Sequence, residues 1–362
     1  MLYRLMAAMR GGAVENIVVS MTPGGGTADK IRNLGIEVET LRMQPGRADP
    51  RGLVRLARIL WAWRPDILQT WLYHADLLGL LAAKFSGNPD VVWNIRCSKT
   101  DARYYSGMSG FVVRTLARLS PLPAAVVANS VAGVKLHTEI GYRPRRWEVV
   151  PNGFDLQQYR PDPEARGAIR QELNIPDGDP VIGLIARLDP LKDHSTFLRA
   201  AALLLEIHPS VRFVLAGAGV TAQNFPFAQA LATNDFAGRL HLLGHRTDIP
   251  QLTAALDVAT CCSTGEGFPN IIGEAMACGV PIVTTDVGDA AVVMAGAGLV
   301  IPPADAPALA AAWRGLLEMP AEKRASAAER SRARIQHQYE IRKIAGLYEH
   351  LYQEISGQMQ NQ

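Results

Sequence analysis

The chain has 362 residues, of which 48% are hydrophobic and 20% charged, and its formal net charge is +3 at pH 7. This length exceeds one ordinary domain and suggests two, and the apolar content is sufficient for sizeable cores. Neither a run of about 18 uncharged apolar residues nor a secretory signal pattern is present, which predicts a cytoplasmic protein without a membrane-spanning helix.

The charge is unevenly distributed along the chain. Residues 1–150 hold 20 Lys and Arg against 11 Asp and Glu, and the remainder holds 17 against 23. A basic front half attracts anions, such as nucleic acid, acidic lipid or a pyrophosphate-bearing substrate. No nucleic-acid-binding motif is present, so we expect no nucleic acid partner. The cysteines, for which reduced buried thiols are expected, have no C-x-x-C or zinc spacing: Cys97, Cys261, Cys262 and Cys278.

The first half of the chain alternates between helical and strand patterns. An amphipathic helix over residues 1–12 ends at a glycine pair, and residues 15–21 read as a strand. Further strands are predicted at 35–43, 66–72, 91–97 and 124–130, with a helix at 51–63. Short apolar strands separated by helical patterns predict a parallel, doubly wound sheet, whose ligands bind beyond the carboxyl ends of the strands.

Three polar residues follow strands at this predicted ligand-binding edge. His74 comes after the strand at 66–72, and Arg96 and Lys99 come after VVWNI, residues 91–95 of the next strand. A lone histidine is as readily structural as functional. The two basic residues either take an acidic or phosphorylated acceptor or are solvated loop charges.

Two helical segments combine arginines with large apolar residues. One is 51–64, with Trp61 and Trp63, and the other is 107–119, with Phe111, Arg114 and Arg118. Either is a basic amphipathic surface that rests on anionic lipid or a core helix with solvated arginines.

The turn-forming stretch PNGFD at 151–155, which includes Asn152, marks a change of domain. A strand, loop and helix follow, with Arg187 and Lys192 in the loop. The next strand runs into Gly217 and Gly219 without the third glycine of a dinucleotide-binding fingerprint.

The next turn carries His245 and Arg246, and Asp248 is the expected cap of the following helix. The D-x-D pattern of Asp177 and Asp179 lies in a turn and is interpreted as solvated, so no metal site is predicted.

Residues 266–289, EGFPNIIGEAMACGVPIVTTDVGD, combine two carboxylates with a helix start. Pro269 favours the first helical turn, and Gly279 and Pro281 end the helix. Glu266 therefore precedes the helix, and Glu274 lies on its second turn. The backbone amides of residues 268–271, with the positive end of the helix dipole, suit a phosphate group.

This stretch resembles the E-x7-E motif of the retaining glycosyltransferases of family 4, with GFPN inside the motif and EAMACGVP after it. The resemblance implies the GT-B fold, in which two doubly wound parallel-sheet (Rossmann-like) α/β domains face a cleft. It implies an acceptor-side domain at 1–150, a nucleotide-sugar-binding domain at 151–335, and a helix at 336–362 that returns to the first domain.

The family's roles carry over to matching residues. Glu266 would face the donor sugar, Glu274 would hold the nucleotide ribose, and Arg187 and Lys192 would grip the donor diphosphate. His74 would approach the transferred sugar and the acceptor, and Asn152 would lie in the hinge. The remaining expected donor contacts are Gly267, Phe268, Pro269, Asn270, Ile271, Gly217, Gly219, His245 and Arg246.

The implied activity is transfer of a hexose from a nucleoside-diphosphate sugar, with retention of configuration and without a metal or other cofactor. The expected acceptor is a glycan or a polyprenyl-pyrophosphate-linked glycan at the cytosolic membrane face, as in bacterial surface polysaccharide assembly. Two alternatives stay open: a sugar-nucleotide epimerase of similar architecture, and a catalytically impaired nucleotide-sugar-binding protein.

The family opens with a strand and a glycine-rich loop before its first helix, and no such segment precedes the helix at 1–12. A start placed too late is the favoured explanation, and a truncated chain or a protein that works without this loop are the alternatives.

Overall fold

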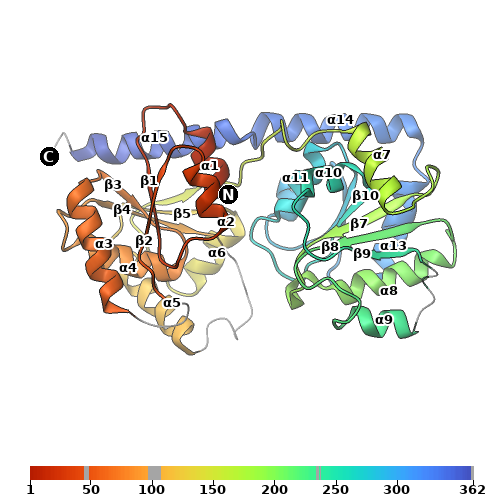
Figure 1. Cartoon of the computed structure of the whole chain (residues 1–362), viewed down its shortest axis with the longest axis horizontal. Helices are drawn as coiled ribbons and strands as arrows, with labels where there is room; N and C mark the ends of the chain where they lie inside the picture. Colours follow the sequence, from red (N-terminus) through yellow and green to blue (C-terminus); the bar gives the residue numbers. More distant parts are fainter. Residues whose placement is uncertain (45–48, 97–106, 234–235, 237, 360–362) are drawn as a thin grey trace. The chain divides into compact units, whose positions relative to one another are not determined.

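The computed structural model describes residues 1–44, 49–96, 107–233, 236 and 238–359. It is an α/β structure in which every strand pairing of these residues is parallel. The chain forms two compact units (Figure 1), Met1–Gly153 with Ile341–Gln362, and Phe154–Glu340. The predicted α/β class with two Rossmann-like bodies is confirmed.

The first unit contains two parallel sheets and the helices that cover them. Its elements are α1 (Leu2–Ala8), β1 (Ile17–Ser20), α2 (Gly26–Arg32), β2 (Glu37–Thr40), α3 (Pro50–Trp63), β3 (Ile67–Gln69), α4 (Tyr73–Ala83), β4 (Asp90–Ile95), α5 (Gly107–Leu119), β5 (Ala125–Ala128), α6 (Val131–Glu139), β6 (Trp147–Val149) and α15 (Ile341–Met359). Strands β1 and β2 pair with each other, and β3, β4, β5 and β6 form the second sheet in that order.

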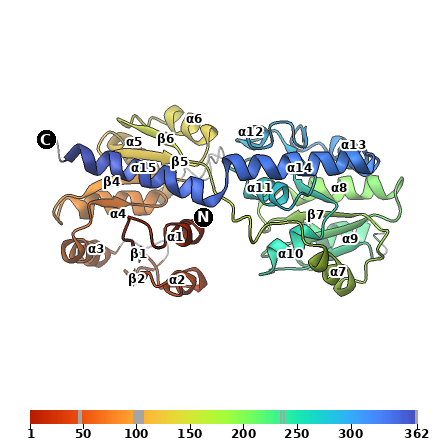
Figure 2. The ribbon, with the colours of Figure 1, turned by 90° about the horizontal axis from the view of Figure 1, so that it is seen from above.

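Side chains of both sheets of this unit pack into the same two hydrophobic clusters, one on each face. Val18 of β1 and Ile67 of β3 pack into the cluster formed with α1 and α15, which lie side by side (Figure 2). Their chain neighbours Val19 and Leu68 pack into the cluster on the other face, with α3 and α4. Because successive side chains of a strand point to opposite faces, both sheets are sandwiched between the same two helix layers.

The second unit is one six-stranded sheet with helices on both faces. Its elements are α7 (Pro163–Glu172), β7 (Val181–Ile185), the 3-10 helix η2 (Pro190–Lys192), α8 (His194–Leu205), β8 (Arg212–Ala216), α9 (Phe227–Thr233), β9 (Leu240–Leu242), α10 (Ile249–Ala254), β10 (Val258–Cys261), α11 (Asn270–Ala277), β11 (Ile282–Thr285), α12 (Ala290–Met294), β12 (Leu299–Ile301), α13 (Ala306–Leu317) and α14 (Ala321–Gln338).

The strand order of this sheet locates a ligand site. The order is β12-β11-β10-β7-β8-β9, so the chain moves outward from β7 in one direction and from β10 in the other. In open parallel sheets, ligands bind beyond the carboxyl ends of the strands at this change of direction. The loops that follow β7 and β10 are the two that carry Arg187, Lys192 and Glu266.

The last helical stretch of the chain is two helices, α14 and α15, and not one. The break lies at Tyr339 and Glu340, between α14 and α15. Here the N–H of Phe154 donates to the carbonyl of Tyr339 at 2.8 Å, and Phe154 forms a parallel β-bridge with Glu340. This extended pairing with a distant segment interrupts the helix. The hydrophobic periodicity of the sequence does not indicate the interruption, because the partner segment is far away in the chain.

In the part of the chain that the structure describes, no helix has both the length and the apolar character needed to cross a membrane. Cys261, Cys262 and Cys278 are free and buried, as expected, and Cys97 lies outside the described residues. Burial raises the pKa of each of these three thiols.

Candidate active site

The loop after β7 is held by backbone contacts with the loop after β8. The N–H of Ala186 donates to the carbonyl of Ala216 at 2.9 Å, and that of Leu188 donates to Ala218 at 2.8 Å. A Cβ on Gly217 would lie 2.1 Å from the carbonyl oxygen of Ala186. Glycine is therefore required at 217 because the backbone that leads to Arg187 passes against it. A Cβ on Gly219 would lie 2.9 Å from the Cβ of Leu188.

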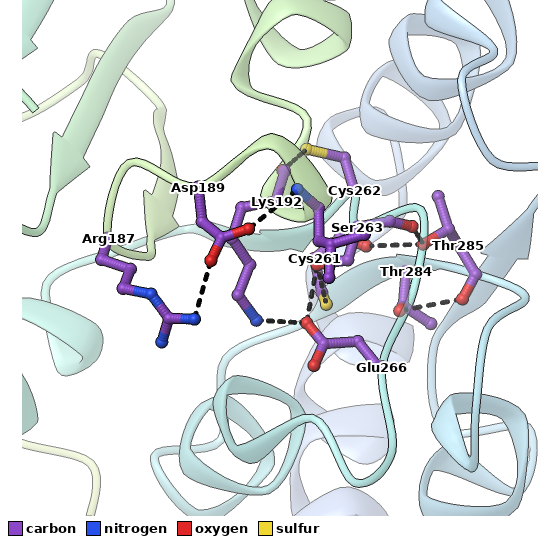
Figure 3. A network of polar contacts seen from close by, with 10 residues as sticks. Arg187, Asp189, Lys192, Cys261, Cys262, Ser263, Glu266, Thr284 and Thr285 are labelled. Carbon is purple, nitrogen blue, oxygen red and sulfur yellow. Dashed lines mark hydrogen bonds and ion pairs between the residues drawn. The ribbon is translucent and has the colours of Figure 1, made fainter. Parts of the chain in front are cut away.

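Glu266 is fixed by a polar network between the β7 and β10 loops (Figure 3). Its Oε1 accepts hydrogen bonds from the ammonium of Lys192 and, at 2.7 Å, from the hydroxyl of Ser263. The side chains of Glu266 and Lys192 are only 11% and 23% exposed. The carbonyl of Ser263 in turn accepts from the hydroxyl of Thr285 at 2.5 Å, and the N–H of Thr264 donates to Leu191 at 2.8 Å. The two loops are thus bound to each other around one carboxylate.

The loop after β11 holds the backbone of Glu266 from another side. The N–H of Asp289 donates to the carbonyl of Gly267 at 2.9 Å. Gly288, at φ +57°, leaves no room for a side chain, because a Cβ there would lie 2.3 Å from the carbonyl oxygen of Glu266. The loop at 287–289 therefore packs directly on the segment that presents the carboxylate.

Arg187 projects from the same loop as Lys192, but farther from Glu266 than Lys192 (Figure 3). Its Nη2 donates to Oδ2 of Asp189 at 2.8 Å, and the Arg187 side chain is 60% exposed. Asp189 caps η2, accepting from the N–H of Leu191 at 3.0 Å. Asp189 thus connects the exposed guanidinium to the turn that positions Lys192.

Helix α11 begins at Asn270, one residue after the predicted start, with Pro269 as the N-cap residue. Phe268 is buried and stacks on Phe154 with ring centroids 6.2 Å apart, so its side chain belongs to the core. Glu274 is also buried, on the second turn of the helix. Because the side chains of Phe268 and Glu274 are buried, the expected phosphate site at the start of α11 would be formed by backbone groups. Gly267 and Pro269 are buried, Ile271 is half-buried and Asn270 is exposed.

The turn after β9 places Arg246 against carboxylates. Arg246 donates to both oxygens of Glu172, at 2.5 and 3.0 Å, and to Asp248. The two carboxylates raise the pKa of Arg246. Asp248 occupies the predicted N-cap position of α10, but it makes no side-chain cap bond, because its carboxylate is bonded to Arg246. The prediction of its capping bond is wrong, and the adjacent His245 is exposed.

In the first unit, Arg96 and Asn152 are brought together. Nη2 of Arg96 donates to Oδ1 of Asn152, and the guanidinium lies over the ring of Trp71 at 4.9 Å. Nη1 also lies 3.5 Å from the hydroxyl of Tyr348 on α15. Burial lowers the pKa of Arg96. The Arg96 guanidinium is therefore held in one orientation by Trp71 and Asn152. Lys99 lies outside the described residues.

His74 lies on the first turn of α4 and is exposed. The chain reaches it through Leu72, which has φ +74° and is bonded through its N–H to the carbonyl of Asn94 at 3.2 Å. A bulky non-glycine residue with positive φ is strained, and such strain is often found at functional positions. The turn that presents His74 is thus fixed by β4.

Asp76, on the same helical turn, is a buried carboxyl that sequence reasoning missed. It accepts from the hydroxyl of Thr70 at 2.5 Å, and no partner for its Oδ2 is found in the described structure. Burial, opposed by hydrogen bonds from Thr70 and from the backbone of Asn94, raises the pKa of Asp76 from 3.8 to about 8. The folded protein therefore holds a proton at Asp76 that the unfolded chain releases.

We expect Asp76 to make stability fall as the pH rises towards 8. Between its unfolded and folded pKa values the folded state binds more protons, so the free energy of unfolding decreases by at most about 1.4 kcal/mol per pH unit. Above pH 6.5 the buried His137, whose pKa is lowered from 6.5 to about 4, adds no opposing slope. Urea unfolding from pH 6.5 to 8 should show this loss in the wild type but not in Asp76→Asn, which preserves a neutral side chain.

The exposed Asp66→Asn is the matched control and should retain the wild-type pH dependence. An Asp76→Asn variant that loses stability with pH as steeply as the wild type would contradict the assignment.

Among residues 1–44, 49–96, 107–233, 236 and 238–359, no group of three or more His, Cys, Asp or Glu side chains is arranged to hold a metal ion. Asp179 of the D-x-D turn is bonded to Arg212, whose Nε donates to it at 2.8 Å.

The chain belongs to the glycosyltransferases of group 1 and has the GT-B fold. Residues 1–153 match the family model described as glycosyl transferase 4-like domain, and residues 179–319 match that of glycosyl transferases group 1. The Anabaena protein HepE, whose structure was solved in complex with UDP, is 24% identical and superimposes with a TM-score of 0.84. The match covers 98% of this chain and 95% of HepE.

Two bacterial enzymes are similar in sequence. One is the Escherichia coli UDP-Gal:alpha-D-GlcNAc-diphosphoundecaprenol alpha-1,3-galactosyltransferase, 27% identical over 248 residues, or 66% of this chain and 62% of that enzyme. The other is the Campylobacter jejuni N,N'-diacetylbacillosaminyl-diphospho-undecaprenol alpha-1,3-N-acetylgalactosaminyltransferase, 26% identical over 281 residues, or 74% of this chain and 73% of that enzyme. The chain thus spans less than two thirds of the length of the Escherichia coli relative.

Proposed function

We propose that this chain is a retaining glycosyltransferase of family 4 that transfers a sugar from a nucleoside-diphosphate donor to a lipid-linked glycan. The observation that carries this proposal is the network of Lys192, Ser263 and Glu266 at the carboxyl ends of β7 and β10, with Arg187 on the same loop. A held carboxylate suits sugar hydroxyls, and the neighbouring cations suit a diphosphate.

The names of the similar proteins narrow the proposed substrates. HepE was solved with UDP, and the Escherichia coli relative is named for UDP-Gal and an acceptor linked to diphosphoundecaprenol. The Campylobacter jejuni relative is also named for a diphospho-undecaprenol acceptor. We therefore propose a UDP-sugar donor and a polyprenyl-diphosphate-linked acceptor, in the synthesis of a bacterial surface polysaccharide such as lipopolysaccharide. We propose that the reaction takes place at the cytoplasmic face of the membrane.

The proposed chemistry is a same-face displacement. The bond between the anomeric carbon and the diphosphate oxygen breaks, an acceptor hydroxyl oxygen bonds to the same face of that carbon, and the departing phosphate oxygen takes the hydroxyl proton. Glu266 holds donor hydroxyls in position and does not attack. Arg187 and Lys192 stabilise the negative charge that develops on the diphosphate.

Metal independence is part of the proposal. Two cations on one loop, together with the backbone amides at the start of α11, supply the electrostatic role that a divalent cation has in other transferases. His74, Arg96 and Asn152 are proposed to contact the acceptor, in the first unit.

The test of the donor site is calorimetric titration with UDP, GDP, ADP and CMP. We expect UDP to bind most tightly, and Glu274→Gln to weaken UDP binding at least about tenfold, because a hydrogen bond to a charged group contributes about 1.5–3 kcal/mol. The exposed Glu322→Gln on α14 should bind UDP as the wild type does. Thermal unfolding of Glu274→Gln checks that the buried substitution leaves the fold intact.

The other outcomes distinguish the remaining functions. Binding of none of the four nucleotides would contradict the donor site. Conversion of a UDP-sugar into its epimer without any acceptor would identify an epimerase. Tight UDP binding with no transfer to a polyprenyl-diphosphate-linked glycan would identify a binding protein.

A further inference from the structure

Helix α3 exposes a surface of arginines and large apolar residues. The helix, Pro50–Trp63, contains no Asp or Glu. Its exposed residues include Val54, Arg55, Arg58 and Trp61, of which Trp61 is 65% exposed. A soluble surface helix normally carries mixed charges, with its apolar residues directed at the core. The outward side of α3 departs from this pattern in both respects.

Two neighbouring hollows in the first unit share the side chain of Arg58. One, of 440 Å³, is lined by Leu53, Val54, Ala57, Arg58, Trp61 and Phe85. The other, of 370 Å³, is lined by Glu39, Thr40, Arg42, Arg55, Arg58 and Ile59. Phe85, which follows α4, is 72% exposed. An apolar hollow therefore adjoins a hollow in which three arginines meet a single acid.

The charges of the second hollow are not balanced by ion pairs. No salt bridge to Arg42, Arg55 or Arg58 is found among the described residues. Arg55 is oriented by donating to the carbonyl of Leu41 at 2.5 Å, and Arg42 has φ +52°. Arginines that line one hollow repel one another. A bound anion would offset the repulsion.

We propose that this surface, defined by Arg42, Arg55, Arg58, Val54, Trp61 and Phe85, rests on the anionic phospholipid of a bilayer. Trp61, Phe85 and Val54 enter the headgroup region, and the arginines contact lipid phosphates. An amphipathic helix with arginines and a tryptophan has the chemistry that binds membrane interfaces, and each basic residue adds to attraction by an anionic leaflet. The inference rests on the proposed function, whose acceptor is lipid-linked, and it names the face that meets the membrane.

Helix α5 is the other basic amphipathic segment of this unit. It exposes Phe111, together with Arg114 and Arg118. Arg114 has an interaction partner, as Arg55 of α3 does. The α3 surface joins two exposed aromatic residues and three converging arginines, so charge complementarity favours α3, and α5 provides a matched comparison.

The experiment is co-sedimentation of the full chain with phosphatidylcholine vesicles that contain or lack phosphatidylglycerol. We expect binding to the anionic vesicles, a loss of about tenfold or more in Trp61→Ser with Phe85→Ser, and a loss of about fivefold in Arg58→Gln. The comparison variant, Phe111→Ser with Arg118→Gln, should bind within about twofold of the wild type.

Several results would overturn the proposal. These are equal binding of the wild type and the α3 variants, no dependence on phosphatidylglycerol, or a loss confined to the α5 variant. Light scattering that shows a dimer disrupted by the α3 variants would assign the face to a second copy of the chain instead.

UDP titration of the same variants separates this proposal from the proposed function. Unchanged UDP affinity with lost vesicle binding supports the membrane face while leaving the donor site intact. Absence of UDP binding in the wild type would contradict the donor site, without altering how the vesicle data are read.

Discussion

Replacement of Glu266 by glutamine is expected to lower kcat by about a hundredfold or more, with a smaller effect on the KM for the donor. The substitution keeps the size of the side chain but removes the charge that Lys192 and Ser263 hold in place. Loss of one preorganised electrostatic partner costs about 10²–10³ in kcat when its contact strengthens in the transition state. Initial rates of transfer from a labelled UDP-sugar, at saturating acceptor, measure this effect.

Two further variants show whether the effect comes from the site. Ser263→Ala removes one of the hydrogen bonds to the carboxylate and leaves its charge, so we expect a reduction of about tenfold. Glu322→Gln, on the exposed side of α14, should leave kcat unchanged. A kcat for Glu266→Gln within about threefold of the wild-type value, instead of the expected loss of about a hundredfold, would contradict the role that we propose.

The sequence predicted those parts of the fold that depend on local patterns. Pro269, Gly279 and Pro281 placed a helix after Glu266, and α11 lies at Asn270–Ala277. Helix α13 likewise begins at Ala306, with a proline in its first turn. In both cases residues within a few positions determine the backbone, through a fixed φ, a missing N–H or a left-handed residue. Such signals are readable without knowledge of the rest of the chain.

Contacts between distant segments were not predictable in this way. Tyr348 is bonded to Asn94 across 254 positions at 2.9 Å, and it lies beside Arg96. The break after α14 depends on the backbone of Phe154, which is also remote in sequence. Nothing near either position indicates the partner, because the pairing is a property of the folded topology. The sequence therefore left Arg96 open between an acceptor contact and a solvated loop charge, whereas the structure packs its guanidinium on Trp71.

The candidate site was predicted as a set of residues, but not as a network. Lys192 and Glu266 were assigned to different parts of the donor, and the structure joins their side chains across 74 positions. A cation and a carboxylate on neighbouring loops attract each other, so each holds the other in place. The pairing connects the proposed diphosphate contact with the proposed sugar contact. We infer that changes at either residue affect both.

Arg187→Ala is expected to lower kcat/KM by about a hundredfold and to leave the free energy of unfolding nearly unchanged. The guanidinium is 60% exposed, although the Asp189 side chain is only 11% exposed, so solvent screens the ion pair, and we expect it to contribute about 0–1 kcal/mol. Its effect on the reaction is larger, because charge develops on the departing diphosphate and a fixed cation stabilises it. Steady-state kinetics and urea unfolding of the same preparation measure the two effects.

A comparison of Arg187 with Arg314 distinguishes a catalytic cation from a general loss of positive charge. Arg314 is exposed on α13 in the same unit, and Arg314→Ala should change neither kcat/KM nor stability. Arg187→Lys retains the charge but loses the planar fork that matches phosphate oxygens, so its activity should lie between those of the wild type and Arg187→Ala. Equal rates in Arg187→Ala and Arg314→Ala would exclude Arg187 from the donor site. A large loss of stability in Arg187→Ala alone would instead assign Arg187 to the support of η2 through Asp189.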